Sequence, residues 1–240
     1  MLAKTEGIIF RTTKYSESSV IAAIYTEQFG LQSYIINGVR GKSKTLKPSL
    51  IQPLAMLSME VYKREGKNIN RAKSLEPLFL FKEIPFDVVK SSLAMFIAEV
   101  LNKCVVEEEK NSALFNFLKA KIISLDEEKS VSDFHLKFLA QLTSYLGFSP
   151  HGKYSEATPV FDLMEGSFVS AAKNLHPHFV VGETARDLSE LFSPSPNLFP
   201  QGRGTVARKE ILTALLEYYS LHVSSFKKIK SLEVLEQVFA

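Results

Sequence analysis

The spacing of apolar residues changes at Glu76–Pro77, and this change constrains the fold of the chain more than any other feature. Before it, short runs rich in Ile, Val, Tyr and Phe are separated by Gly30 and by Asn37–Gly38, a pattern typical of β-strands. Five such runs in so short a segment predict a small antiparallel barrel or sandwich. The strands are expected at Gly7–Thr12, Ser18–Thr26, Leu31–Ile36, Leu50–Tyr62 and Lys67–Leu75.

After Pro77, apolar residues recur every three or four positions, which indicates amphipathic helices. Gly147 is placed to end the third of them, and Pro159–Val169 predicts a β-hairpin with Glu165–Gly166 at its tip. We therefore expect an α+β protein with a barrel at 1–76 and a mostly helical domain at 77–240, which carries a hairpin insertion near 154–172. The helices are expected at Phe86–Glu109, Asn111–Ser124, Val131–Leu146, Glu183–Phe192, Thr205–Val223 and Ser231–Phe239.

The cysteine count excludes two classes of site. Cys104 is the single cysteine of the 240 residues, so neither an intramolecular disulfide nor a zinc site built from several thiolates can form. It lies on the apolar face of a predicted helix, which favours a buried structural thiol. No signal peptide is evident, and the most apolar helix carries too many charges to span a bilayer. We expect a cytoplasmic protein.

The net charge of +3 hides an uneven distribution. Residues 1–75 carry 12 Lys and Arg against 5 Glu, a balance of +7, whereas the remaining 165 residues carry 17 basic and 21 acidic side chains, a balance of −4. A basic strand region followed by a mildly acidic helical region suggests a polyanionic partner such as nucleic acid.

The segment Gly38–Pro48 lies between two predicted strands and carries four cations. Its glycines are too close together for a phosphate-binding P-loop. The loop is either an ordinary solvated turn or a contact for nucleic-acid phosphates, and the basic excess around it favours the contact. The candidate DNA-binding residues are Arg40, Lys42, Lys44 and Lys47 in the loop, and Lys63, Arg64, Lys67, Arg71 and Lys73 on the strands that follow.

Aromatic residues in the strand region could stack on bases. Phe10, Tyr25 and Tyr34 lie in apolar strands and are expected in the core, whereas Tyr15 lies in a polar turn and is the better stacking candidate. A second basic set near the C-terminus either extends the nucleic-acid track or consists of helix-end cations. Its members are Arg203, Arg208, Lys209, Lys227, Lys228 and Lys230.

Signals for catalysis and metal binding are weak. His176 and His178 are the one close histidine pair, and they lack the further ligands that a metal would need. No nucleophile elbow, metalloprotease motif or dinucleotide fingerprint is present, so we predict no catalytic residue.

Blocks of sequence along nearly the whole chain resemble the RecO family of bacterial DNA repair and recombination mediators. The blocks are Thr5–Thr12, Tyr15–Ser18, Tyr25–Leu31, Gly38–Gly41, Leu50–Pro53, Phe138–Pro150, Tyr218–His222 and Lys230–Leu235. The resemblance implies an N-terminal OB-fold barrel and a helical domain, without a cofactor. It also implies binding of single- and double-stranded DNA, annealing of complementary strands and help in loading the recombinase RecA. The implied partners are the acidic C-terminal tail of single-strand-binding protein and RecR, at the bacterial nucleoid.

The sequence departs from this family in two places. Many relatives carry a four-cysteine zinc knuckle where this chain has 154–172 without cysteine, so we expect packing of Phe161, Leu163, Phe168 and Val169 to hold the hairpin. A basic pair that some relatives use for the acidic tail is reduced here to Lys137, which can still offer a point charge.

Two alternatives remain open. An RNA-binding OB-fold protein of translation or ribosome assembly would show the same basic barrel, and RNA differs from DNA in its 2′-hydroxyls. A nuclease would need clustered carboxylates for metal ions, whereas the basic first third has five Glu and no Asp.

Overall fold

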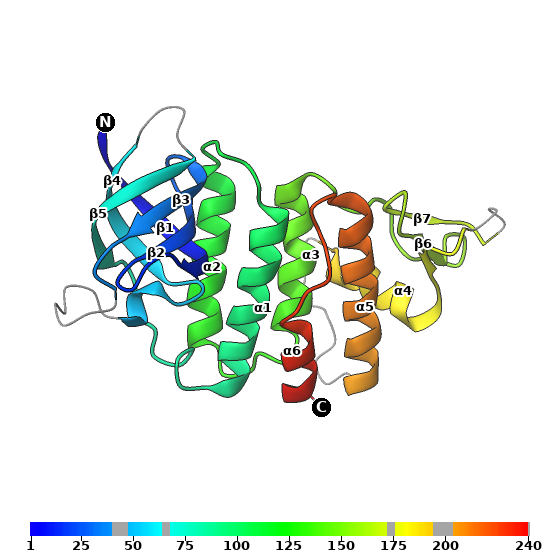
Figure 1. Cartoon of the computed structure of the whole chain (residues 1–240). Coiled ribbons are helices and arrows are strands. Elements are labelled where there is room, and N and C mark those ends of the chain that lie inside the picture. Colours follow the sequence, from blue (N-terminus) through cyan, green and yellow to red (C-terminus); the bar gives the residue numbers. More distant parts are fainter. Residues whose placement is uncertain (40–47, 64–67, 172–175, 194–203, 240) are drawn as a thin grey trace. The chain divides into compact units, whose positions relative to one another are not determined.

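The computed structural model describes residues 1–39, 48–63, 68–171, 176–193 and 204–239, which form two compact units. The first comprises 1–129 and 229–238, and the second comprises 130–228 with Phe239. Figure 1 shows the barrel strands from blue to cyan, followed by the helices. Each unit is described separately below.

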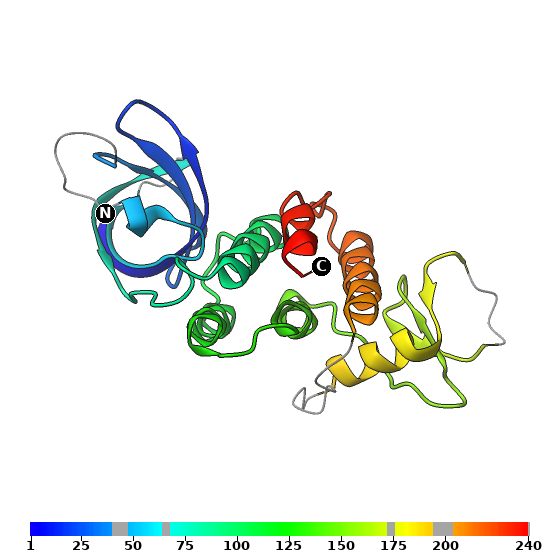
Figure 2. The same ribbon diagram turned by 90° about the horizontal axis from the view of Figure 1, so that it is seen from below.

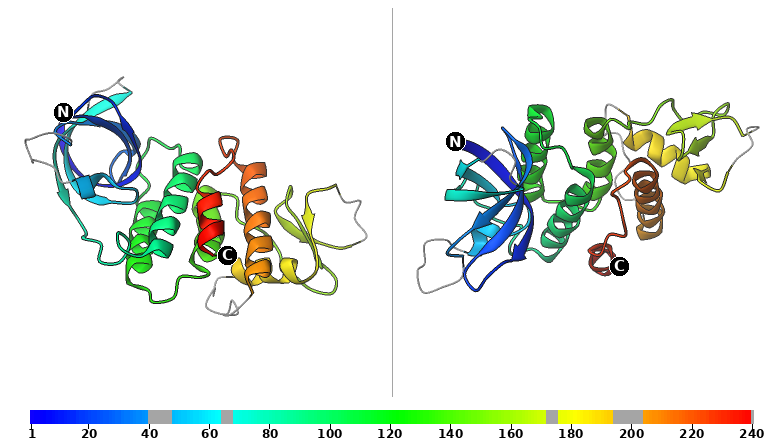
Figure 3. Two further views of the ribbon diagram at one scale, coloured as in Figure 1. Left: turned by 60° about the horizontal axis from the view of Figure 1, so that its bottom comes forward. Right: turned by 45° about the horizontal axis from the view of Figure 1, so that its top comes forward.

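Five strands close the barrel of the first unit in the order β1-β2-β3-β5-β4. The ring is visible in Figure 2 and in the left view of Figure 3. Neighbouring strands are antiparallel except for β3 and β5, which close the barrel as a parallel pair. This topology confirms the predicted OB-type barrel. The strands are β1 (Leu2–Lys14), β2 (Val20–Thr26), β3 (Gly30–Ile36), β4 (Met56–Tyr62) and β5 (Ile69–Pro77).

The barrel interior is apolar because alternate residues of each strand point inward. Ile9, Ile24, Tyr34 and Met59 belong to this core and have almost no exposed surface. Gly7 is required where β1 crosses the core, since a Cβ there would lie 2.6 Å from Ile24 Cγ2 and 2.7 Å from Met59 Sδ.

The expected strand at Leu50–Tyr62 was wrong in its first half. Pro48–Ile51 form a 3₁₀ helix, and Leu54 adopts a left-handed backbone conformation with φ of 62° before β4 begins. Proline at 48 and 53 cannot donate to a strand ladder, so the chain turns there instead of pairing. Val39 and Ala55 nevertheless remain in the barrel core.

Helices α1 (Val88–Cys104), α2 (Ser112–Glu127) and α6 (Leu232–Val238) complete the first unit. Asp87 and Asn111 cap α1 and α2 by accepting hydrogen bonds from Lys90 N and Leu114 N. The predicted extension of α1 to Glu109 was wrong, because the chain after Cys104 runs beside β3, where Glu107 O accepts a hydrogen bond from Leu31 N.

Asp126 anchors the connection between the barrel and α1. Its fully buried carboxylate accepts hydrogen bonds of 2.9 Å from the backbone N–H groups of Lys82, Glu83 and Ile84. Although burial raises the pKa of Asp126, these donors and Lys90 hold it below its ordinary value. Asp126 is therefore a buried structural carboxylate.

The second unit combines helices with a small sheet in the order β7-β6-β8. Strands β6 and β7 form the predicted hairpin, in which Phe161, Leu163 and Phe168 are buried. Gly147 ends α3 with φ of 82°, as predicted. The elements are α3 (Phe134–Leu146), β6 (Val160–Asp162), β7 (Ser167–Val169), β8 (Phe179–Val180), α4 (Gly182–Leu191) and α5 (Thr205–His222). Across the described ranges, no helix has the length and apolar character needed to cross a bilayer.

Candidate nucleic-acid interface

Cross-strand register places an aromatic ring and cations together on the outer face of β1, β4 and β5. Tyr62 on β4 pairs with Leu2 on β1 and with Arg71 on β5, so the three residues form one row across the strands. Tyr62 is 40% exposed and Leu2 48%, and Arg71 is also exposed. The row gives an aromatic and aliphatic surface beside a guanidinium group, a combination suited to a base and its phosphate.

The neighbouring row is ionic. Glu60 on β4 contacts Lys73 Nζ at 3.0 Å and Lys4 Nζ at 3.8 Å. Hydrogen bonding and charge attraction from Lys73 lower the pKa of Glu60. Two cations share one carboxylate here, so the row keeps a net positive charge that an incoming phosphate can use.

Lys63 directly follows β4 in the chain. Its ammonium group lies 4.3 Å from the centroid of the Phe29 ring, a cation–π distance. The contact holds one of the predicted DNA-binding cations at the barrel surface. Of the other predicted barrel cations, Arg40, Lys42, Lys44, Lys47, Arg64 and Lys67 lie outside the described residues.

The aromatic residues of the barrel divide as predicted between core and surface. Tyr25 and Tyr34 are fully buried, and burial raises the pKa of each hydroxyl to about 12. Phe10 is also buried and stacks on Tyr25 with 5.7 Å between ring centroids. Tyr15 is 61% exposed at the end of β1, where a stacking partner can reach it.

The second basic set does not form one cluster of equivalent cations. Arg208 Nε donates a 2.9 Å hydrogen bond to the buried carboxylate of Asp133, so its charge supports the packing of the second unit. Lys209, Lys227 and Lys228 are exposed in that unit, whereas Lys230 belongs to the first unit. Arg203 lies outside the described residues. Lys137 is half-exposed on α3, beside the fully buried Leu136.

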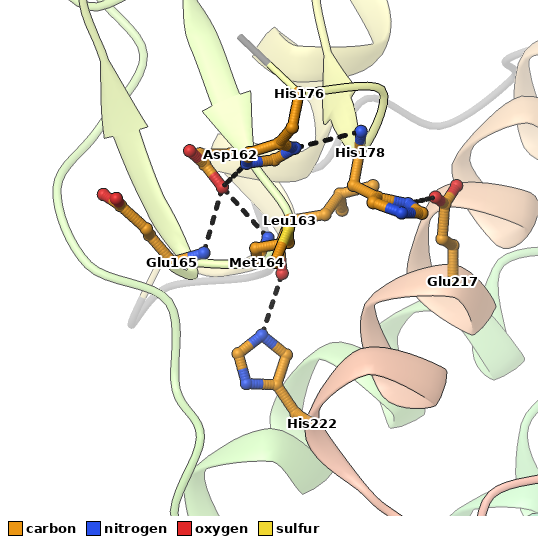
Figure 4. Close-up of polar contacts among 8 residues, drawn as sticks. All are labelled: Asp162, Leu163, Met164, Glu165, His176, His178, Glu217 and His222. Carbon is orange, nitrogen blue, oxygen red and sulfur yellow. Dashed lines mark hydrogen bonds and ion pairs between the residues drawn. The ribbon is translucent and has the colours of Figure 1, made fainter. Parts of the chain in front are cut away.

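The residues at the place of the family's zinc knuckle form a hydrogen-bonded network, shown in Figure 4. The buried Asp162 accepts hydrogen bonds from Met164 N and Glu165 N, and lies 3.0 Å from His176 Nε2. His176 Nδ1 accepts a hydrogen bond from His178 N, so the ring proton is on Nε2 and is donated to Asp162. Burial raises the pKa of Asp162, but these partners outweigh it and lower the pKa.

Two further histidines tie the small sheet to α5. His178 Nδ1 lies 2.6 Å from Glu217 Oε1, and His222 Nε2 donates a hydrogen bond of 2.8 Å to Leu163 O. The ring nitrogens of His178 and His222 that make these contacts are thus engaged by protein groups. The residues do not fit zinc, because the described parts of the chain contain no group of three His, Cys, Asp or Glu able to hold a metal ion.

Comparisons with known proteins agree with this architecture. A family model described as "Recombination protein O N terminal" matches residues 1–81, and one described as "Recombination protein O C terminal" matches residues 85–233. Proteins named "DNA repair protein RecO" align over the full length of both chains. They are 35% identical in Bacteroides fragilis, 34% in Flavobacterium psychrophilum and 28% in Porphyromonas gingivalis. With matches along nearly all of its length, the chain belongs to the RecO family of DNA repair proteins.

Proposed function

We propose that this chain is a non-enzymatic DNA-binding mediator of recombination in DNA repair, which binds both single- and double-stranded DNA. The observation that carries the proposal is the outer face of β1, β4 and β5, where Tyr62 lies in register with Arg71 and beside the cations of the ionic row. The excess of +7 in residues 1–75 supports the same ligand. Membership in a family of DNA repair proteins supports the cellular process.

The proposed mechanism is electrostatic. Two complementary strands repel each other through their phosphates, and binding both to one positive surface lowers that repulsion, so that pairing becomes faster. Acting on strands coated by single-strand-binding protein, the same surface would help the recombinase RecA to load. No step in this mechanism requires a covalent intermediate or a cofactor.

We assign the protein partners to the second unit. Its half-exposed Lys137 offers a point charge to the acidic C-terminal tail of single-strand-binding protein, and RecR is the second expected partner. The proposed place of action is the bacterial cytoplasm, on nucleoid DNA.

Salt dependence of DNA binding tests the barrel surface. Arg71→Ala should weaken binding and lower the slope of log K against log salt by about 0.7–0.9 if Arg71 contacts one phosphate. Replacing Lys42, Lys44 and Lys47 together by Ala should flatten the slope further. Lys129→Ala is the charge-matched control, because Lys129 is exposed at the end of α2 and outside the barrel. Equal slopes for Arg71→Ala and Lys129→Ala would remove Arg71 from the interface.

Annealing of fluorescent complementary oligonucleotides tests the mediator role. The protein should accelerate pairing of strands coated by single-strand-binding protein, and removal of the acidic tail should reduce this effect. No acceleration in either case would contradict the mediator proposal. Tighter binding to RNA than to DNA of the same length would favour the RNA-binding alternative, and magnesium-dependent strand cleavage would favour a nuclease.

A further inference from the structure

A groove of about 450 Å³ lies in the first unit between β1, the turn before β4, α1 and α6. Its walls are largely apolar. Met95 on α1 and Val234 on α6 line it as exposed large side chains, 47% and 41% accessible, and Pro53 and Ala98 add to the apolar lining. Such a volume suits a ligand the size of a nucleobase with its sugar.

Positive charge lines the same groove. Arg11 on β1 and Lys230 before α6 are both exposed lining residues. The one carboxylate of the lining, Glu99, accepts hydrogen bonds from Lys230 N, Ser231 N and Ser231 Oγ and lies 3.2 Å from Lys103 Nζ. Because the Glu99 carboxylate is already engaged by these donors and by Lys103, Arg11 and Lys230 remain to attract an anionic ligand to the groove.

A β-bulge directs Arg11 to this place. The register between β1 and β2 shifts between Ile9 and Arg11, so Phe10 is buried against Tyr25 while Arg11 stays exposed at the groove. Bulges commonly re-aim a side chain next to a functional site. Tyr15 follows four residues later on the same face of the extended chain, at a distance of about 13 Å. The exposed ring of Tyr15 thus lies further along the same strand, outside the groove lining but within reach of a neighbouring nucleotide.

We propose that this groove holds one unpaired base of single-stranded DNA. The inference rests on the DNA binding proposed above and gives it a preference for single strands. A nucleobase is a flat aromatic ring with a polar edge: the Met95 thioether and the Pro53 ring meet its faces, and Asn102 and Thr12 of the lining meet its edge. Arg11 and Lys230 meet the flanking phosphates.

This occupant explains more of the surface than an acidic peptide does. A peptide carboxylate would satisfy Arg11 and Lys230, but it would leave the exposed ring of Tyr15 without a role. A base in a paired duplex cannot enter the groove without leaving its stack. The groove therefore discriminates single strands from duplexes, whereas the cations on the outer face of the barrel, which contact phosphates, do not.

Met95→Glu tests the proposal because Met95 is exposed, so the variant can fold, and the new carboxylate faces the groove. The matched control is Val88→Glu, the same charge change at a more exposed position of the same helix outside the groove lining. We expect Met95→Glu to weaken binding of a dT20 oligonucleotide by about 10-fold relative to Val88→Glu, the scale of one lost base contact. Duplex affinity should change equally in the two variants.

Crosslinking locates the base directly. A dT20 strand carrying one 4-thiothymidine should crosslink on irradiation to α1 or α6 at the groove, and Met95→Glu should remove this crosslink while Val88→Glu keeps it. Equal dT20 affinity of the two variants, or crosslinks confined to other segments, would overturn the groove assignment alone. If the wild-type chain bound no DNA, the proposed function itself would fail. Loss of binding of a fluorescein-labelled Glu/Leu peptide in Met95→Glu, with unchanged dT20 affinity, would identify a peptide site and would also overturn the proposal.

Discussion

Replacing Glu99 by Gln should loosen α6 by a predictable amount. The carboxylate accepts two backbone hydrogen bonds of 2.9 and 2.8 Å, from Lys230 N and Ser231 N, and one of 2.7 Å from Ser231 Oγ. A glutamine amide keeps one acceptor oxygen and presents N–H groups to the other donors, so at least one charge-assisted hydrogen bond is lost. Since α6 is a helix of seven residues, it depends strongly on these contacts.

The pKa of Glu99 gives the magnitude. Burial alone would raise it, but the N–H groups of Lys230 and Ser231, the Ser231 hydroxyl and Lys103 lower it from 4.5 to about 2. That difference corresponds to about 3 kcal/mol in favour of the ionised form. Because 21% of the side chain is exposed, solvent screening reduces this value, and we expect Glu99→Gln to cost about 1–2 kcal/mol at pH 7.

Hydrogen exchange of the α6 amides is the direct measurement. At pH 7 the Leu235 amide, which bonds to Ser231 O, should exchange about 5–30-fold faster in Glu99→Gln than in the wild-type chain. A group whose pKa is lowered by folding stabilises fully above its ordinary pKa, and this stability is lost as pH falls from 4.5 toward about 2. The difference between the two proteins should therefore shrink by roughly half at pH 3.

The control is Glu108→Gln, in the exposed segment after α1, which should leave α6 exchange unchanged. Equal protection of the α6 amides in Glu99→Gln and the wild-type chain at pH 7 would show that the Glu99 carboxylate does not hold α6. A difference of the same size at pH 3 and pH 7 would show that the carboxylate charge is not its source.

Three other perturbations have defined outcomes. Gly30→Ala should lower the free energy of unfolding in urea denaturation by about 2 kcal/mol or more, because φ is +61° and the new Cβ would lie 2.5 Å from Glu107 O. The control Gly147→Ala also has a positive φ, of +82°, but no atom lies within 4 Å of the new Cβ. It should lower the free energy of unfolding by only about 1 kcal/mol. Asp162→Asn should speed exchange of the neighbouring β6–β7 turn amides at pH 7. Since folding lowers the pKa of this carboxyl, the difference should begin to shrink as pH falls below the ordinary pKa of 3.8 and should vanish only below the lowered folded-state pKa. Burial raises the pKa of Cys104 to about 12, so a thiol reagent at pH 8 should label Cys104 only after the chain unfolds; rapid labelling of the folded protein would contradict the buried position.

Periodicity and turn residues were sufficient to predict the order and type of the main elements. The five strands depend on alternation of apolar residues, and the left-handed Gly147 ends α3 where a glycine was expected to do so. These are local signals, and the structure follows them except before β4, where proline intervenes, and after Cys104, where α1 ends earlier than predicted. The third strand of the small sheet, β8, was not predicted, because its two residues carry no periodic signal.

The candidate site was only partly predictable, because it depends on register. The charge excess indicates nucleic acid, yet nothing in the sequence pairs Tyr62 with Arg71, since their partnership follows from the alignment of β4 with β5. Arg11 was missed for a similar reason. A single arginine in an apolar strand is no sequence signal for a binding site. Its place at a groove follows from the β-bulge at Phe10, which only the structure shows.

In the C-terminal segment, cations that are neighbours in the sequence belong to different structural units. Lys227, Lys228 and Lys230 look like one basic cluster, but the first two belong to the second unit and Lys230 to the first. Lys230 is placed by a hydrogen bond from its backbone to Glu99, a residue 131 positions earlier, and α6 then supplies Val234 to the groove. The groove thus depends on a long-range contact that the barrel does not need, since its five strands close without α6. Loss of the Glu99 contact should therefore weaken single-strand preference before it affects the phosphate-binding face of the barrel.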